Sequence, residues 1–188
     1  MKRLFDFFCN RGSALRGAVT ATMLSLGLAI IANVGGVAPA AAQQFTVPFE
    51  ANQYILDQTN LYRQQNGLPK LTMFHPANKA ADDYAQFLAQ NKASGHEADG
   101  RTPTDRVNAA GGKGKFCAIA ENVHGSWASP MKSWEQASAR AMEAWKNSSG
   151  HAANMRSGNN KMGIGVHGWK HGDMWHYRFV QVFVLTNC

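Results

Sequence analysis

The sequence has few cysteines, and none of them stands in a redox motif. Three occur in 188 residues, and no C-x-x-C pair is present, which argues against a thiol–disulfide oxidoreductase. After residue 42, lysines and arginines never form a run, and no ladder of aromatic residues lies between them. Nucleic-acid binding is therefore a poor expectation. No G-x-S-x-G nucleophile elbow surrounds Ser126 or Ser148, and no internal repeat is found.

Charged residues are absent between Arg16 and Glu50, whereas the first sixteen residues carry four basic side chains. The uncharged stretch begins with an apolar segment at 18–32, and small residues at Ala40 and Ala42 follow it. This order predicts a signal peptide over residues 1–42, cleaved after Ala42. An uncleaved membrane anchor is the alternative, although the apolar segment is short for a span. The absence of a cysteine at the cleavage point and of paired arginines favours general secretion.

Removal of the leader leaves 146 residues with a mild net charge of +4. We expect a linker at residues 43–50 and one domain at 51–188, which is long enough to bury a core. The protein would be secreted, extracellular or periplasmic, with no stable membrane span after cleavage. Cys117 and Cys188 form an even pair in an oxidising compartment, which predicts a disulfide between them. Two thiols that never approach one another are the alternative.

Hydrophobic periodicity predicts helices in the first two thirds of this domain and a hairpin at its end. In the last arm of the hairpin, aromatic residues alternate with Val180, Val182 and Val184, so both faces are apolar, as expected of a central strand. This order favours an α+β sheet with helices on both faces rather than a βαβ array. Predicted helices cover 48–66, 75–92, 102–111 and 133–147, a strand covers 116–125, and the hairpin begins at 161.

The tripeptide Ser-Gly-His occurs twice, ending at His96 and at His151, each time in a segment rich in breakers beside a helix. Glu121 lies in an apolar strand, where a carboxylate is unfavourable unless it is paired. These three residues predict either a mononuclear metal site with open positions or a glutamate that orients one imidazole. A buried polar network in which the three satisfy one another is a further alternative. His124 is a candidate for lining the same cleft.

Five segments in order, "LYRQQNGLPKL", "SGHEADGRTPTDRV", "AENV", "AMEAWKNSSGHAANM" and "MGIGV", make the chain resemble the CAP superfamily. These are the cysteine-rich secretory, antigen 5 and pathogenesis-related proteins with an SCP domain, and the likeness is to the bacterial branch. The resemblance covers about residues 51–184. It implies a three-layer α-β-α sandwich with a cleft that holds two histidines and two glutamates. In several members the histidines bind zinc or another divalent cation.

Carried across by position, the resemblance assigns His96 and His151 as the cleft histidines and Glu121 as the first glutamate. The second glutamate is missing, because Ser148 stands at its position, and the resemblance makes Ser148 a candidate binding residue. Glu143 lies two residues before Trp145, about 200° around the helix, and should face solvent. The "CGHYTQ" stretch of eukaryotic members is also absent, so activities tied to it are not expected here.

Three functions follow as expectations, and whether the protein is an enzyme stays open. The first is a secreted binding module whose His/Glu-lined cleft takes a divalent metal, a lipid or small apolar ligand, a peptide or an envelope polymer, without turnover. The second is a metal-assisted peptidase or esterase in which Glu121 accepts a proton from bound water. The third is a structural role alone for the two histidines and Glu121.

Overall fold

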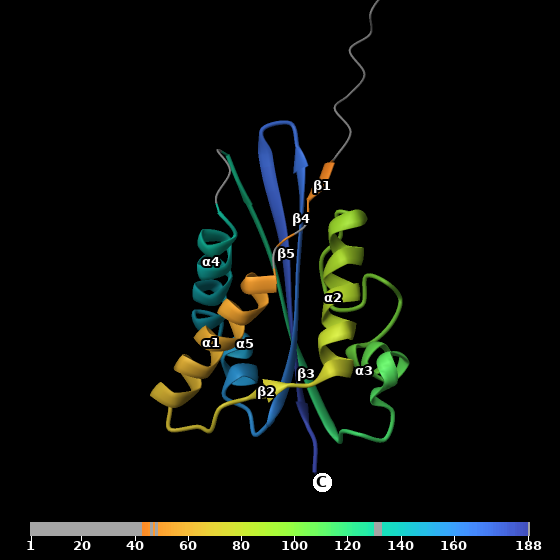
Figure 1. Ribbon diagram of the computed structural model, residues 1–188, viewed down its shortest axis with the longest axis vertical. Helices are drawn as coiled ribbons and strands as arrows, with labels where there is room; N and C mark the ends of the chain where they lie inside the picture. Colours follow the sequence, from red (N-terminus) through yellow and green to blue (C-terminus); the bar gives the residue numbers. More distant parts are fainter. Residues whose placement is uncertain (1–42, 46, 48, 130–132, 188) are drawn as a thin grey trace, which may run out of the picture. The chain divides into compact units, whose positions relative to one another are not determined.

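The computed structural model describes residues 43–45, 47, 49–129 and 133–187 (Figure 1). The predicted signal peptide lies outside these residues, and so does Cys188. Five strands form one sheet in the order β1-β4-β5-β3, with β2 paired in parallel to the start of β4. Their bounds are β1 Gln43–Phe45, β2 Thr72–Met73, β3 Ala118–Ala128, β4 Lys161–His171 and β5 Met174–Leu185.

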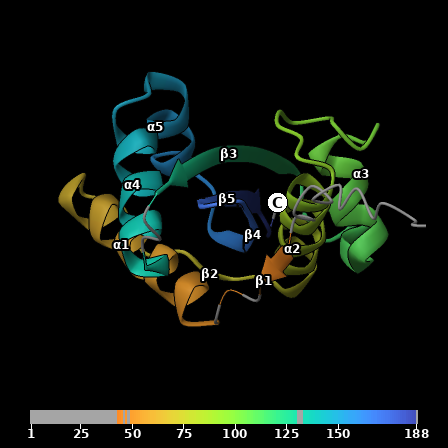
Figure 2. The same cartoon turned by 90° about the horizontal axis from the view of Figure 1, so that it is seen from above.

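Helices cover both faces of this sheet, and the two views agree on their placement (Figures 1 and 2). On one face lie α1 (Phe49–Gln65), α4 (Trp134–Lys146) and α5 (Ser149–Met155). On the other lie α2 (His75–Gln90) and α3 (Pro103–Val107). The expected three-layer α-β-α sandwich is confirmed.

The central strand β5 shows why two helical layers can share one sheet. Tyr177, Phe179 and Phe183 belong to the hydrophobic cluster under α1 and α4, whereas the alternating valines of the same strand belong to the cluster under α2. Successive side chains of a strand point to opposite faces, so the sequence alternation of aromatic and β-branched residues builds both cores. The prediction of a central strand with two apolar faces is confirmed.

Two glycines of β4 allow α2 to pack against the sheet backbone. A Cβ on Gly163 would lie 2.1 Å from the carbonyl carbon of Ala77, and one on Gly165 would lie 2.2 Å from the carbonyl oxygen of Ala81. Both neighbours are backbone atoms of α2. Asn78 of α2 also accepts a hydrogen bond from the amide of Ile164 at 3.1 Å. The motif "MGIGV" is thus the surface against which the buried alanine face of α2 packs. The alanines of this face are Ala77, Ala80, Ala81, Ala85 and Ala89.

The structure differs from the sequence-based expectations in three places. Residues 43–45 form an edge strand paired with β4, within the region expected to be a linker. The helix expected over 102–111 ends at Val107 and continues as a π-type turn, Asn108–Gly112. The second Ser-Gly-His, expected in a turn, begins α5, because Ala152 and Met155 give this short segment a buried side.

The predicted disulfide remains a prediction, since Cys188 lies outside the described residues. The amide of Cys117 donates a hydrogen bond to the carbonyl of Leu185 at 2.9 Å. Cys117 therefore lies beside Leu185, the last residue of β5. Leu185 precedes Cys188 by three residues in the sequence.

Candidate functional site

A buried carboxylate on the edge strand β3 is the centre of the candidate site. Glu121 is 6% exposed, and each of its oxygens has its own partner. Oε1 lies 2.9 Å from Nδ1 of His96, and Oε2 accepts a hydrogen bond from Nη2 of Arg106 at 2.8 Å. Burial raises the pKa of the Glu121 carboxyl, while Arg106 and His96 oppose that rise. The carboxylate has been removed from water and paired on both sides.

Arg106, which the sequence reasoning did not single out, organises the loop that carries His96. Its guanidinium is buried and also donates to Asp99 Oδ1 at 2.8 Å, to the Arg101 carbonyl at 2.7 Å and to the His96 carbonyl at 2.9 Å. The guanidinium carbon lies 3.5 Å from the centre of the Tyr84 ring, a cation–π contact. One side chain thus fixes the carboxylate, the loop and the backbone of the histidine.

Tyr84 and a capping box hold this loop from its two ends. The Tyr84 hydroxyl donates to the Gly95 carbonyl at 2.6 Å and accepts from the Ala98 amide at 3.1 Å. At the start of α3, Thr102 and Asp105 satisfy one another's backbone amides, which is a capping box. The backbone of Gly95 has a φ of +102°, which favours glycine and turns the chain so that His96 faces the strand.

His151 is positioned from the other helical layer by a chain of buried amides. Asn122 donates to the carbonyl of His151 at 3.1 Å and to Oε1 of Gln181 at 3.0 Å. Gln181 in turn donates to the hydroxyl of Thr59 in α1 at 2.8 Å. Asn154 of α5 donates to Oδ1 of Asn122 at 2.9 Å and to the carbonyl of Glu121 at 3.2 Å. The neighbours Glu121 and Asn122 therefore reach opposite faces of the sheet.

His96 and His151 are tied to neighbouring residues of β3, His96 to Glu121 and the backbone of His151 to Asn122. The charge of His96, together with burial as the larger cause, lowers the pKa of His151. Within the described ranges, no hydrogen bond or ion pair joins the ring of His151 to His96 or Glu121. In the same part of the chain, no group of three or more His, Cys, Asp or Glu side chains is arranged to hold a metal ion.

The remaining sequence candidates have these places. Ser148 is the N-cap residue of α5, and its side chain makes no capping hydrogen bond. Glu143 is exposed and pairs with Lys146 at 3.1 Å, which confirms that it faces solvent. His124 lies on β3 with its ring centre 6.3 Å from Trp145 and 6.2 Å from Phe179.

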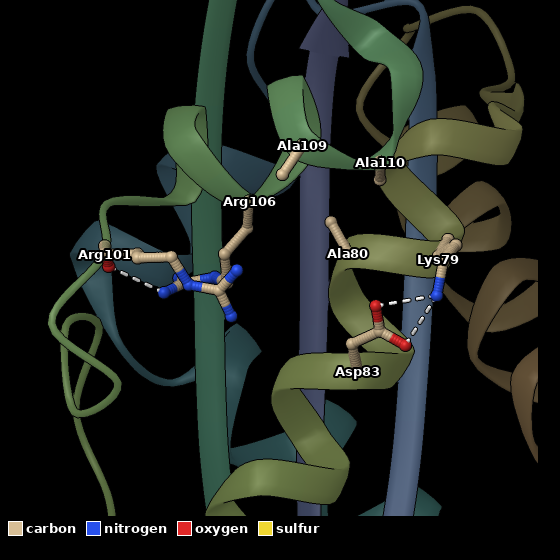
Figure 3. Close-up of a pocket in the computed structure, with 7 residues that line it drawn as sticks. All are labelled: Lys79, Ala80, Asp83, Arg101, Arg106, Ala109 and Ala110. Carbon is tan, nitrogen blue, oxygen red and sulfur yellow. Dashed lines mark hydrogen bonds and ion pairs between the residues drawn. The ribbon is translucent and has the colours of Figure 1, made fainter.

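A small cavity lies behind the guanidinium of Arg106 (Figure 3). Its volume is about 70 Å³, enough for a water molecule or two. Nε of Arg106 is buried and has no hydrogen-bond partner in the part of the chain that the structure describes. Lys79 and Asp83, which also line the cavity, pair with one another at 2.8 Å. We expect an ordered water to accept from Nε here, because buried polar groups are seldom left unsatisfied.

Acidification is expected to destabilise the fold through histidines near the site. Burial lowers the pKa of His124 and of His151 below the usual 6.5. The unfolded chain therefore binds more protons, so stability is full above pH 6.5 and falls as the pH drops below it. Melting temperatures between pH 7.5 and 5.5 measure this effect. His124→Phe, which keeps the ring packing, should flatten the curve, and an unchanged slope would contradict the assignment.

Comparison with known proteins identifies a matching family and solved structures with a similar fold. The model of the cysteine-rich secretory protein family matches residues 56–183. An outer surface protein from Borrelia burgdorferi is similar in structure, with 21% identity and a TM-score of 0.61, covering 78% of this chain and 99% of that one. An extracellular protein with an SCP domain from Bacillus anthracis has 22% identity and a TM-score of 0.56, covering 73% of this chain and 41% of that one.

No curated protein matches the sequence. At 21–22% identity, the likeness to these solved structures shows a shared fold and nothing about function. No helix among the described residues has the length and apolar character needed to cross a membrane. The family match extends over more than half of the chain and includes His96, Glu121 and His151. The chain therefore belongs to the cysteine-rich secretory protein family, the CAP family.

Proposed function

We propose that this protein is an extracytoplasmic binding module that holds a divalent cation, zinc or a similar ion, on His96 and His151. The observation that carries the proposal is the 2.9 Å contact between Nδ1 of His96 and the buried carboxylate of Glu121. A carboxylate that accepts from one ring nitrogen fixes the tautomer and leaves the other nitrogen as a metal ligand. Secretion is part of the proposal and is supported by the signal peptide predicted over residues 1–42 and by the descriptions "outer surface" and "extracellular" of the two similar structures.

The donor set fits two imidazole ligands rather than a triad. Both oxygens of Glu121 are engaged, by His96 and by Arg106, so this carboxylate supports a ligand and is not itself one. His151 suits the role because its lowered pKa keeps the ring neutral near pH 7, and neutral imidazole is the form that binds metal. Solvent or a bound partner would fill the other coordination positions.

The same geometry gives a hydrolase little support. A general base needs a free carboxylate oxygen within reach of water, yet Arg106 and His96 occupy Glu121 at 2.8 and 2.9 Å. Among the described residues, no hydrogen bond joins the hydroxyl of Ser148 or Ser126 to a side chain that could act as a base. Binding without turnover is therefore the function that the arrangement favours.

A zinc titration monitored by melting temperature tests this proposal. Zinc at about 100 times its Kd should stabilise the native protein by about 2.7 kcal/mol, a rise of several degrees for a chain of this size. His96→Ala and His151→Ala should each remove the zinc-dependent rise, whatever they do to stability in EDTA. His171→Ala, at an exposed histidine of the β4–β5 hairpin, is the matched control and should retain it. An equal rise in the His96→Ala/His151→Ala double variant would reject the site.

A further inference from the structure

The outer edge of β3, beyond the candidate metal site, is not paired with another strand among the described residues. The order β1-β4-β5-β3 places β3 at the border of the sheet, and its eleven residues pair with β5 alone. Figure 2 shows this strand along the border between the two helical layers. An edge strand presents backbone N–H and C=O groups that another chain can use.

The backbone groups that face outward can be assigned from one hydrogen bond. The carbonyl of Glu121 accepts from Asn154 Nδ2 at 3.2 Å, so the backbone of Glu121 faces away from β5. In an antiparallel ladder this orientation alternates, and the register with β5 is continuous. The backbone groups of Val123, Gly125 and Trp127 therefore also face outward. No side chain or loop within the described ranges bonds to them.

A shallow cavity of about 360 Å³, wide open to solvent, lies along this half of the strand. It is lined by His124, Gly125, Ser126, Trp127 and Arg140. His124 and Ser126 share the face toward α4, the helix that carries Arg140. Trp127 is 64% exposed, a large aromatic side chain at the far end of the same edge. Aromatic residues are enriched at protein–protein interfaces relative to the rest of the surface.

The charge of the cavity selects one kind of occupant. Arg140 is exposed and has no ion-pair partner among the described residues, and no carboxylate lines the cavity. A second copy of this chain fits poorly, since the segment from Val123 to Ala128 has no acidic residue to place against Arg140. A strand with Asp or Glu side chains, or with a free carboxyl terminus, is complementary.

We propose that an extended acidic peptide of a partner protein binds along the open edge of β3 between Val123 and Ala128, as an added antiparallel or parallel strand. Six residues span about 20 Å at the strand rise. Main-chain hydrogen bonds to the outward-facing groups provide affinity, and the cavity beside Arg140 selects an acidic side chain. The proposal does not depend on a metal ion at His96 and His151.

Fluorescence polarisation with short labelled peptides in EDTA tests the proposal on the full protein. The probe is an eight-residue peptide of alternating valine and glutamate. One comparison peptide has lysine in place of glutamate, and another has N-methyl groups on alternate amides. The acidic peptide should bind at least tenfold more tightly than either one. Amide NMR shifts should concentrate at Val123, Gly125 and Trp127.

Charge reversal provides the matched variants. Arg140→Glu should weaken the acidic peptide at least tenfold and should improve binding of the lysine peptide. Lys70→Glu makes the same change in net charge at an exposed turn far along the chain, and it should change Kd less than twofold. Equal binding of all three peptides, or equal effects of the two variants, would overturn the proposal. Self-association through β3 in the absence of peptide would overturn it in favour of a second copy.

Discussion

Replacing Arg106 by methionine is expected to lower the free energy of unfolding by about 3–5 kcal/mol, the usual cost of removing one partner of a buried ion pair. The substitution leaves Glu121 and Asp99 without the guanidinium that contacts each of them at 2.8 Å. It also removes the contacts to the carbonyls of His96 and Arg101, which hold the loop between these two residues. Chemical denaturation at pH 7 measures the loss.

Two further variants separate charge from packing. Arg101→Met removes a half-exposed partner of the same Asp99 and should cost less than about 1 kcal/mol. The double variant Arg106→Met/Glu121→Gln should recover part of the loss, because one of the two stranded charges is gone. A loss for Arg101→Met as large as that for Arg106→Met would contradict the central role of Arg106.

The pH dependence of the Arg106→Met variant has a definite sign. Arg106 opposes the rise that burial causes in the pKa of Glu121, so its removal raises that pKa further. The folded variant then binds a proton more readily than the unfolded chain does, and stability is lost as the pH rises through the folded pKa. The deficit relative to the original protein should therefore shrink on acidification toward the ordinary pKa of a glutamate.

Gly165→Ala and Gly163→Ala are each expected to destabilise the fold by about 3 kcal/mol or more, at or beyond the upper end of what overpacking costs. In both cases the added Cβ would lie close to backbone atoms of α2, at 2.2 and 2.1 Å. A side chain could rotate away, but a helix backbone can move only as a unit. Thermal denaturation, together with the loss of near-ultraviolet circular dichroism, reports the displacement of α2.

Gly150→Ala is the matched control, because a Cβ there meets no atom within 4 Å. Gly150 lies in α5, where alanine is favoured over glycine by about 0.5–1 kcal/mol. This variant should therefore be neutral or slightly more stable. If all three alanine substitutions cost the same, close packing of α2 on β4 is not the reason for the glycines.

The layers of the fold could be predicted because the patterns that produce them are local. The alternation along β5 and the alanine face of α2 each report which sides are buried. The cap at Thr102 and Asp105 was likewise predictable, since a capping box spans only four residues. The end of α3 was harder to predict from the sequence, because the π-type turn at Asn108–Gly112 follows the helix directly and changes only the hydrogen-bond pattern.

The site was only partly predictable, for a physical reason. His96, Glu121 and His151 stand out as chemistry-bearing residues, but their partners do not. Arg106 sits beside Val107 in a five-residue helix, and nothing local distinguishes a buried arginine from a solvated one. Its role depends on Asp99 and Glu121, which the fold brings to it. Asn122 and Gln181 are similar, since amides in strands carry no periodic signal. A conspicuous carboxylate in an apolar strand is the one hint that a cation must lie opposite.

The chain of amides from Thr59 to His151 limits how this site can be reused. Transplanting the two histidine segments onto another scaffold would leave the second imidazole unanchored, unless donors from the first helix and the central strand came with them. Natural drift faces the same restriction, because an exchange such as Thr59→Val in α1 would remove the acceptor of Gln181. Gln181 would then be free to pair elsewhere, and the short helix α5 could shift. Related proteins should therefore differ in the exposed residues around the two histidines. The buried hydrogen-bonded chain from Thr59 to His151 should change only as a whole.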